Sequence, residues 1–469
     1  MIRPAERLRA PAFAAAFLVP ASAHAHGFGT RYELPLPLAV YLASAGLTII
    51  LSFLAMGWFS RRAVAIGEGL SLDVLATLPG RVLASAPVLF VLRLAAVALF
   101  VLVVCAGLLG SQSPLKNIAP AFVWALWWVG MTYISALVGD LWALLNPLDI
   151  LFRWAEAAYA RLRPGRRLSL HLPYPEAAGM WPAAALFLVF AWMELVWEGA
   201  DRPASLSLAI MGYALLTWTG MALFGRREWL RRGEVFAIVF GLIARFAPTQ
   251  VREADGRWEW KLRPYAVGLL AREPAAASEG ALIVFMLAAV TFDGLRETPL
   301  WVAAGLGEAA GLLAAALLML AAYLLISRAM VVLGEDLQTW RRTAGLFIFT
   351  LIPIAIAYHL AHYLSFLVTV LQYMIPLASD PLGRGWDLFG GATHFVRPGI
   401  VDAKTVWYVA VPAIVIAHVI AVCLAHLLAL REFPGRRVAL RSQYPMVALM
   451  IAYTMSSLWI IAQPIVTER

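Results

Sequence analysis

Two histidines stand three residues apart in an otherwise apolar stretch of the chain. The segment A-Y-H-L-A-H-Y-L-S-F, residues 357–366, places His359 and His362 inside an apolar run that extends from about 344 to 376. Ionisable groups are costly at bilayer depth and usually face a protein interior or a wet cavity. A spacing of three puts both rings on one helical face, where they could share a metal ion. The pattern predicts a functional site inside a membrane.

The composition supports a membrane location for this site. Hydrophobic residues make up 62% of the chain and charged residues 14%, whereas a soluble domain has roughly 25% charged residues. Ten runs reach the roughly 20 apolar residues that a helical span requires. We therefore expect an all-α, polytopic transmembrane helix bundle with the bilayer as its surroundings. The runs lie near 36–59, 85–110, 118–139, 180–198, 204–224, 280–298, 302–326, 344–376, 405–430 and 444–463.

The N-terminal segment has the pattern of a secretory signal. Three arginines, a short apolar run and the small-residue stretch A-S-A-H-A predict a signal peptide over residues 1–25. Cleavage there would leave 26–469 as a single integral membrane domain with His26 at its external N-terminus. An N-terminal histidine can chelate copper through its amine and ring. The alternative is a start of the chain without a metal-binding role.

Basic residues alternate between loops in the way that a cytoplasmic bias predicts. Lys and Arg exceed Asp and Glu by 37 to 28, and the surplus lies in every second loop, so it indicates topology and not a nucleic-acid partner. Both ends of the mature chain should then be external. Counting the short apolar segment 235–248 as re-entrant or interfacial keeps the following basic loop inside.

Residues 151–162 should form an amphipathic helix on the inner surface. Cys105 and Cys423 lie in separate apolar runs and support neither a disulfide nor a zinc site.

Five titratable groups from four of these spans fall at similar depths. At a rise of about 1.5 Å per residue, four of them lie between the midplane and roughly 6 Å outward, and His362 lies about 9 Å outward. Glu194 falls at about 7 Å by the same arithmetic. The five groups are Asp293, Glu308, His359, His362 and His418.

Such a layer is suited to metal-assisted hydrolysis. Imidazoles with one or two carboxylates bind zinc or a similar divalent ion, and a bound water can become a hydroxide nucleophile. We expect His359, His362 and His418 as ligands of zinc or copper, with Asp293 and Glu308 as the catalytic or supporting carboxylates. The alternatives are structural: the histidines could simply bond neighbouring helices, and Asp293 could cap a helix or pair with Arg296.

A second cluster lies in the external loop 379–395, directly after the His359 span. Asp380, Asp387 and His394 stand there among glycines and aromatic residues. Glycine and proline allow turns, and the aromatic rings could rest at the membrane interface. The loop is either a lid over an outward-opening cavity or an interfacial anchor.

Several segments carry a family resemblance. H-G-F-G-T-R-Y-E-L-P-L-P-L, T-F-D-G-L-R-E-T-P-L-W, A-Y-H-L-A-H-Y-L-S-F and S-D-P-L-G-R-G-W-D-L-F-G, in this order from residue 26 onward, resemble bacterial polytopic membrane proteins labelled fenitrothion hydrolase. W-Y-V-A-V-P-A-I-V-I-A-H-V-I-A-V-C-L-A-H and R-S-Q-Y-P-M extend the resemblance to the last span. It implies an inner-membrane enzyme that hydrolyses a small apolar organophosphorus triester. No catalytic residues are carried over from it.

Two other functions compete with hydrolysis. The same layer could bind copper, zinc or protons midway across the membrane in a transporter or metal-handling protein, although no inverted repeat is visible. Haem ligation by His359 and His418 on facing helices is a further possibility, and a purely structural role is another.

Overall fold

The computed structural model describes residues 32–59, 71–254, 257–270, 273–397 and 399–467. The predicted signal peptide and His26 lie outside these ranges. Ten helical segments of the described chain are long and apolar enough to cross a membrane, which confirms the predicted all-α transmembrane bundle. They are α1 (Leu38–Phe59), α3 (Ala86–Leu109), α4–η3–α5 (Ile118–Leu137), Glu176–Leu195, which contains α8 (Trp181–Leu195), α9 (Pro203–Phe224), α12 (Ala277–Arg296), α14 (Glu308–Leu333), α15–η6–α16 (Trp340–Ser379), α17 (Ala403–Glu432) and α18 (Arg436–Ile465).

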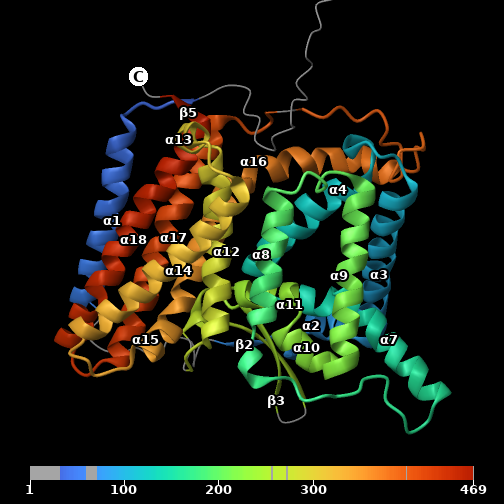
Figure 1. The fold of residues 1–469 in the computed structure, drawn as a ribbon, viewed down its shortest axis with the longest axis horizontal. Coiled ribbons are helices and arrows are strands. Elements are labelled where there is room, and N and C mark those ends of the chain that lie inside the picture. The colour runs from blue at the N-terminus through green and yellow to red at the C-terminus, as the bar shows by residue number, and fades with distance from the viewer. Residues whose placement is uncertain (1–31, 60–70, 255–256, 271–272, 398, 468–469) are drawn as a thin grey trace, which may run out of the picture.

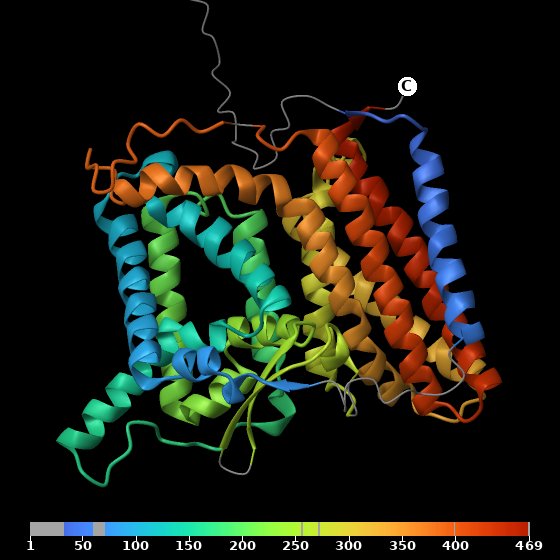
Figure 2. The same ribbon diagram turned by 180° about the vertical axis from the view of Figure 1, so that it is seen from behind.

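The helices form two groups that meet at α12 and α16 (Figure 1). In one group, α1, α14, α17 and α18 pack side by side with α12 and the first part of α16. In the other, α3 packs against α9 and α4, while α5 and α8 contact the short helix α11 (Val235–Ala244). The later part of α16 turns across the end of this second group (Figure 2). The seam between the groups brings α8, α12, α16 and η3 together.

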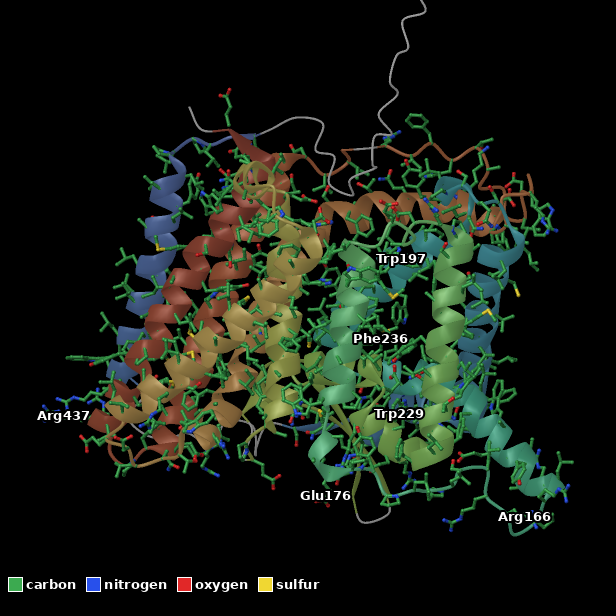
Figure 3. The ribbon with its side chains drawn as sticks, in the orientation of Figure 1. Arg166, Glu176, Trp197, Trp229, Phe236 and Arg437 are labelled. Atoms are coloured by element: carbon green, nitrogen blue, oxygen red, sulfur yellow. The ribbon has the colours of Figure 1, made fainter. Side chains whose placement is uncertain are left out.

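Both ends of the described chain lie at one end of the bundle. Strand β1 (Tyr32–Glu33) pairs in parallel with β5 (Val466–Thr467). An even number of crossings places the two ends on the same side, which agrees with the ten candidate spans. Arg166, Glu176 and Arg437 lie at the opposite end (Figure 3). At that end β2 (Leu72–Asp73), β3 (Thr249–Ala254) and β4 (Arg257–Leu262) form a small antiparallel sheet. The basic-loop pattern predicts that this end faces the cytoplasm, so we label it the inner end and the opposite one the outer end.

The segment predicted as re-entrant or interfacial contains α11, which is enclosed by protein. Ten residues of helix are about 15 Å long, too short to cross a bilayer. Eight of its ten residues are buried, and it contacts α5, α6 (Trp142–Leu145), α8 and α10 (Arg226–Arg232). Glu234 caps its first turn by accepting from the backbone N–H groups of Phe236 and Ala237. The predicted amphipathic helix at 151–162 is part of α7 (Pro147–Leu162).

The seventh span begins later than predicted, and this corrects the depth of Glu308. The apolar run was taken as 302–326, but Pro299–Ala304 form the separate short helix α13, which ends at Gly305 with φ of 62°. Glu308 is therefore the first residue of α14, at the outer end. Its side chain is 45% exposed. The prediction that Glu308 lies near the midplane was wrong because glycines at 305 and 307 interrupt the apolar run.

Close packing of α3 on α9 gives a stability prediction. A Cβ atom at Gly107 would lie 2.0 Å from Ser207 Oγ and 2.5 Å from the Pro203 carbonyl oxygen, whereas one at Gly212 would meet nothing within 4 Å. We expect Gly107→Ala to lower the unfolding free energy by about 1–3 kcal/mol through overpacking. Gly212→Ala should be neutral or stabilising by up to about 1 kcal/mol. Thermal unfolding in detergent measures both, and equal behaviour would contradict the packing.

A candidate proton-binding array at the outer end of the bundle

Four side chains, Asp293, His362, Tyr363 and Glu194, contact one another at the outer end of the bundle, and we call them the array. The first of them, Asp293, lies in the last turn of α12. Asp293 is 2% exposed and accepts a hydrogen bond from Arg296 Nε at 2.9 Å, one helical turn later. The structural alternative considered for Asp293, a pair with Arg296, is thus present. Arg296 also donates to the carbonyl oxygen of Leu195, the last residue of α8, and its Nη1 lies 3.5 Å from Glu308 Oε2. One guanidinium therefore joins the outer ends of α8, α12 and α14.

Two consecutive residues of α16 reach the same carboxylate. His362 Nε2 lies 2.8 Å from Asp293 Oδ2, and Tyr363 Oη lies 2.7 Å from that oxygen. Tyr363 Oη is also 3.0 Å from Glu194 Oε1 on α8. These contacts connect α8, α12 and α16 through polar side chains alone.

The fourth element of the array is a π-helix. Trp128 Nε1 donates to Glu194 Oε1 at 2.8 Å from within η3 (Phe122–Gly130), whose backbone has π-helical hydrogen bonding. Short π-helical stretches are rare, and they occur frequently at functional sites. Here the widened turn lies in the part of the third span that supplies a donor to Glu194.

Hydrogen counting limits how the Tyr363 hydroxyl can bond to the two carboxylates. A phenol carries one hydrogen, yet Tyr363 Oη is within bonding distance of two carboxylates. It can donate to only one of them at a time. The second contact becomes a full hydrogen bond when that carboxyl is itself protonated and donates to Tyr363 Oη.

The charge balance of the buried groups points the same way. Asp293 and Glu194 carry two negative charges when ionised, and Arg296 carries one positive charge, so one negative charge remains. Uncompensated charge is expensive away from water. One added proton would neutralise these three groups. The arrangement is thus suited to binding protons or a cation.

His359 lies beside the array without a polar partner. Its ring is 7% exposed, and neither ring nitrogen has a hydrogen-bond partner. The ring centroid is 4.6 Å from that of Tyr363, 5.5 Å from Tyr133 and 6.0 Å from Trp128. It lines an enclosed cavity of about 40 Å³ together with Glu194 and Thr132, and the other lining residues are mostly apolar.

His418 lies apart from the array. It is buried on α17, where its Nδ1 is 2.8 Å from the Ile414 carbonyl oxygen and its Nε2 has no partner. Its ring packs 6.0 Å from that of Tyr453 on α18. Among the described residues, no group of three or more His, Cys, Asp or Glu side chains is arranged to hold a metal ion. The three-histidine metal site therefore stays a prediction, with His362 directed to Asp293.

The external loop uses its acidic residues to shape its own turns. Asp380 accepts from the backbone N–H groups of Arg384 and Gly385, and Asp387 accepts from that of Ala392. The backbone N–H of His394 donates to the Gly391 carbonyl oxygen. Backbone bonds from Ser111 and Ile118 fasten the start of this loop to the outer end of α3 and α4. The lid function stays a prediction.

Sequence reasoning selected the carboxylates and His362 but missed their aromatic partners. Tyr363 follows His362 directly, and Trp128 stands in the run F-V-W-A-L-W-W. Buried Tyr and Trp side chains usually find a partner for their polar atom, which was the available signal. Neither could be assigned to a particular carboxylate without coordinates.

Comparison with known proteins adds no assignment. No family model matches the chain, and no curated protein and no solved structure is significantly similar to it.

Proposed function

We propose that this chain is a proton-coupled membrane transporter whose proton-binding centre is the array of Asp293, His362, Tyr363 and Glu194. The observation that carries the proposal is the single Tyr363 hydroxyl shared by two carboxylates, one of which is paired with His362. Chains of Asp, Glu and His inside membranes are typical of proton relays in pumps and transporters. The predicted alternative, a site that binds copper or zinc, shares α12 and α16 with the array but also uses His418 on α17.

The array offers an ordered route for a proton from the His362–Asp293 pair to Glu194. Glu308 is exposed and contacts Arg296, which holds Asp293, so Glu308 helps to position Arg296 and takes no part in the transfer steps. A proton that reaches the His362–Asp293 pair can pass to Tyr363 Oη while Tyr363 gives its own proton to Glu194. Each transfer breaks one O–H or N–H bond and forms another. Arg296 keeps its proton and serves to hold the carboxylates in place.

Tyr363→Phe tests this route. The substitution removes the hydroxyl between Asp293 and Glu194, so we expect proton flux to fall by a factor of about 10²–10⁴, the range for positioned acid–base groups. The measurement is acidification of proteoliposomes under a potassium diffusion potential, followed with an internal pH dye. Tyr323→Phe is the matched control, because it removes a buried hydroxyl that donates to the Ala344 carbonyl oxygen and so joins α14 to α15, outside the array. Equal flux in both variants would refute the relay.

Hydrolysis of a small apolar ester is the second candidate. His362 held by Asp293 at 2.8 Å is the arrangement of a general base, and the sequence resemblance favours a phosphotriester substrate. The cavity of about 40 Å³ is too small for one, since pockets for drug-sized molecules measure roughly 300–1,000 Å³. An apolar groove between α8 and α14 is larger, about 210 Å³, and opens on the outside of the bundle.

The ester hypothesis has its own assay. Purified protein in nanodiscs would release the nitrophenol from a fenitrothion-like triester, and His362→Gln would abolish that release. If the predicted divalent metal is required, a chelator would stop the reaction and added zinc would restore it.

We place the protein in a bacterial inner membrane with both mature ends external, and protease accessibility of tags at each terminus tests that orientation.

A further inference from the structure

The enclosed cavity beside the array combines two ionisable side chains with aromatic walls. Its volume is about 40 Å³, which is space for roughly three water-sized groups at about 10–15 Å³ each. Glu194 and His359 are its ionisable lining residues, and the rings of Trp128, Phe187 and Tyr363 also line it. Most of the other lining residues are aliphatic. The cavity is therefore a small compartment in which any polar ligand has few possible partners.

The hydrogen-bonding capacity left in the cavity is that of acceptors. Both hydrogen bonds that Glu194 accepts from the described residues, from Trp128 Nε1 and Tyr363 Oη, end on Oε1, so Oε2 accepts none of them. His359 is 7% exposed, and neither ring nitrogen has a partner. A neutral imidazole has one acceptor nitrogen. The hydroxyl of Thr132, another lining residue, already donates to the Trp128 carbonyl oxygen. Buried polar atoms are rarely unsatisfied unless water or a ligand completes them.

The charge beside the cavity favours a monovalent cation with N–H donors. Glu194 and Asp293 outnumber Arg296 by one charge when ionised, and aromatic faces attract cations. Hard metal ions such as Ca²⁺ take about six or more oxygen ligands, whereas Glu194 is the only carboxylate among the described residues that line the cavity. An ammonium group instead needs acceptors, and the free ones are a carboxylate oxygen and an imidazole nitrogen.

Two spans change their helix type beside the cavity. Trp128 belongs to the π-helical η3, and Ile352, another lining residue, begins α16 directly after the 3₁₀ segment η6 (Ile348–Leu351). Such irregular turns inside helices often mark hinges or functional sites, and transporters bind their substrates beside broken helices. An enclosed substrate site must open for exchange, and these two turns are suited to that movement.

We propose that this cavity is the substrate site of the transporter and that its substrate is a small protonated amine, such as ammonium or methylammonium. The proposal rests on the proposed function of the array and names its substrate class. One N–H group of the ligand donates to Glu194 Oε2, and a second donates to the acceptor nitrogen of neutral His359. The positive charge lies against the rings of Trp128, Phe187 and Tyr363, which line the same cavity.

The site couples the cation to the proton of the array. A cation at Glu194 and a proton on Glu194 exclude each other, because each neutralises the same negative charge. When the cation enters, the carboxyl O–H bond of Glu194 breaks and its proton passes to Tyr363 Oη, which gives its own proton to Asp293. The charged and titratable groups that face Glu194 are Asp293, Arg296 and Tyr363, with His359 in the same cavity. Proton and cation therefore exchange in opposite directions.

The test measures binding separately from proton flux. Calorimetry on the purified protein in nanodiscs should show saturable binding of methylammonium and none of tetramethylammonium, which has no N–H group, or of potassium. His359→Phe should weaken methylammonium binding about 10- to 100-fold, the effect of one hydrogen bond to a charged group. Ala289→Leu places a larger side chain in the lining and should abolish binding. His426→Phe alters a buried histidine of α17 outside the lining and should retain wild-type affinity.

Each outcome has a distinct meaning. Wild-type affinity in both His359→Phe and Ala289→Leu would overturn the site, and so would binding of zinc that excludes methylammonium. Equal binding of tetramethylammonium or potassium would overturn the substrate class. Absence of methylammonium binding beside Tyr363-dependent proton flux would overturn this inference and leave the proposed function intact, whereas absence of both would overturn both. Ala289→Leu and the comparison of ligands keep the test decisive if His359→Phe does not fold.

Discussion

Asp293→Asn should abolish proton flux and lower the unfolding free energy by about 3–5 kcal/mol, the cost of leaving one member of a buried ion pair without its partner. Asp293 is 2% exposed and Arg296 22% exposed. An amide could still bond neighbouring groups, but it would neither neutralise the guanidinium nor hold a proton on His362. Thermal unfolding in detergent and flux in proteoliposomes measure the two effects separately.

Two companion variants test whether the stability loss in Asp293→Asn comes from the broken ion pair with Arg296. The double variant Asp293→Asn, Arg296→Gln removes both charges, so it should recover much of the lost stability while flux stays absent. Asp336→Asn breaks an exposed ion pair between Asp336 and Arg328, whose side chains are 61% and 55% exposed respectively. It should lower the unfolding free energy by at most about 1 kcal/mol. A single Asp293→Asn variant with wild-type stability would contradict the ion pair as the anchor of the array.

Glu194→Gln should reduce proton flux by roughly a factor of 10² or more with little change in stability. The amide oxygen can still accept from Trp128 Nε1 and from Tyr363 Oη, so packing and hydrogen bonding are retained. The titratable group is removed. The variant therefore separates proton transfer from structural support, which Asp293→Asn does not.

Glu308→Gln is the comparison for Glu194→Gln, because it removes a carboxylate that contacts Arg296 next to the array. Glu308 is 45% exposed, and its contact with Arg296 is long, at 3.5 Å. Water can replace its role at the outer end, so we expect a reduction in flux of a few-fold at most. If Glu308→Gln were as severe as Glu194→Gln, entry through the exposed carboxylate would be the controlling step. Wild-type flux in Glu194→Gln would remove Glu194 from the route.

The overall architecture could be predicted because it depends on length and composition. Apolar runs of about 20 residues or more give spans, and eight of the ten predicted runs match their helices to within four residues at both ends. One exception is the last run, because α18 begins at Arg436 and the run was predicted to begin at 444. The other exception begins at Gly305-Leu306-Gly307. Two glycines end one helix and begin the next inside a run that hydropathy reads as continuous.

The site was predicted in part, because depth along a helix says nothing of direction around it. Asp293, His362 and Glu194 were predicted to lie at similar depths, and in the structure they are joined, with Tyr363 between Asp293 and Glu194. His418 was placed at a similar depth, but its ring lies against Tyr453 on α18. The rotation of each helix about its own axis decides where its side chains point. It depends on packing between helices far apart in sequence, which a single sequence does not reveal.

The pairing of β1 with β5 places the first and last helices against each other, and this has a consequence for biosynthesis. Helix α1 contacts α17 and α18, which are synthesised long after it. The newly made α1 must therefore remain in the lipid until these partners arrive. It can do so because it carries no charged residue and satisfies its backbone hydrogen bonds internally. The contacts of α1 with α17 and α18 are then a late step of assembly.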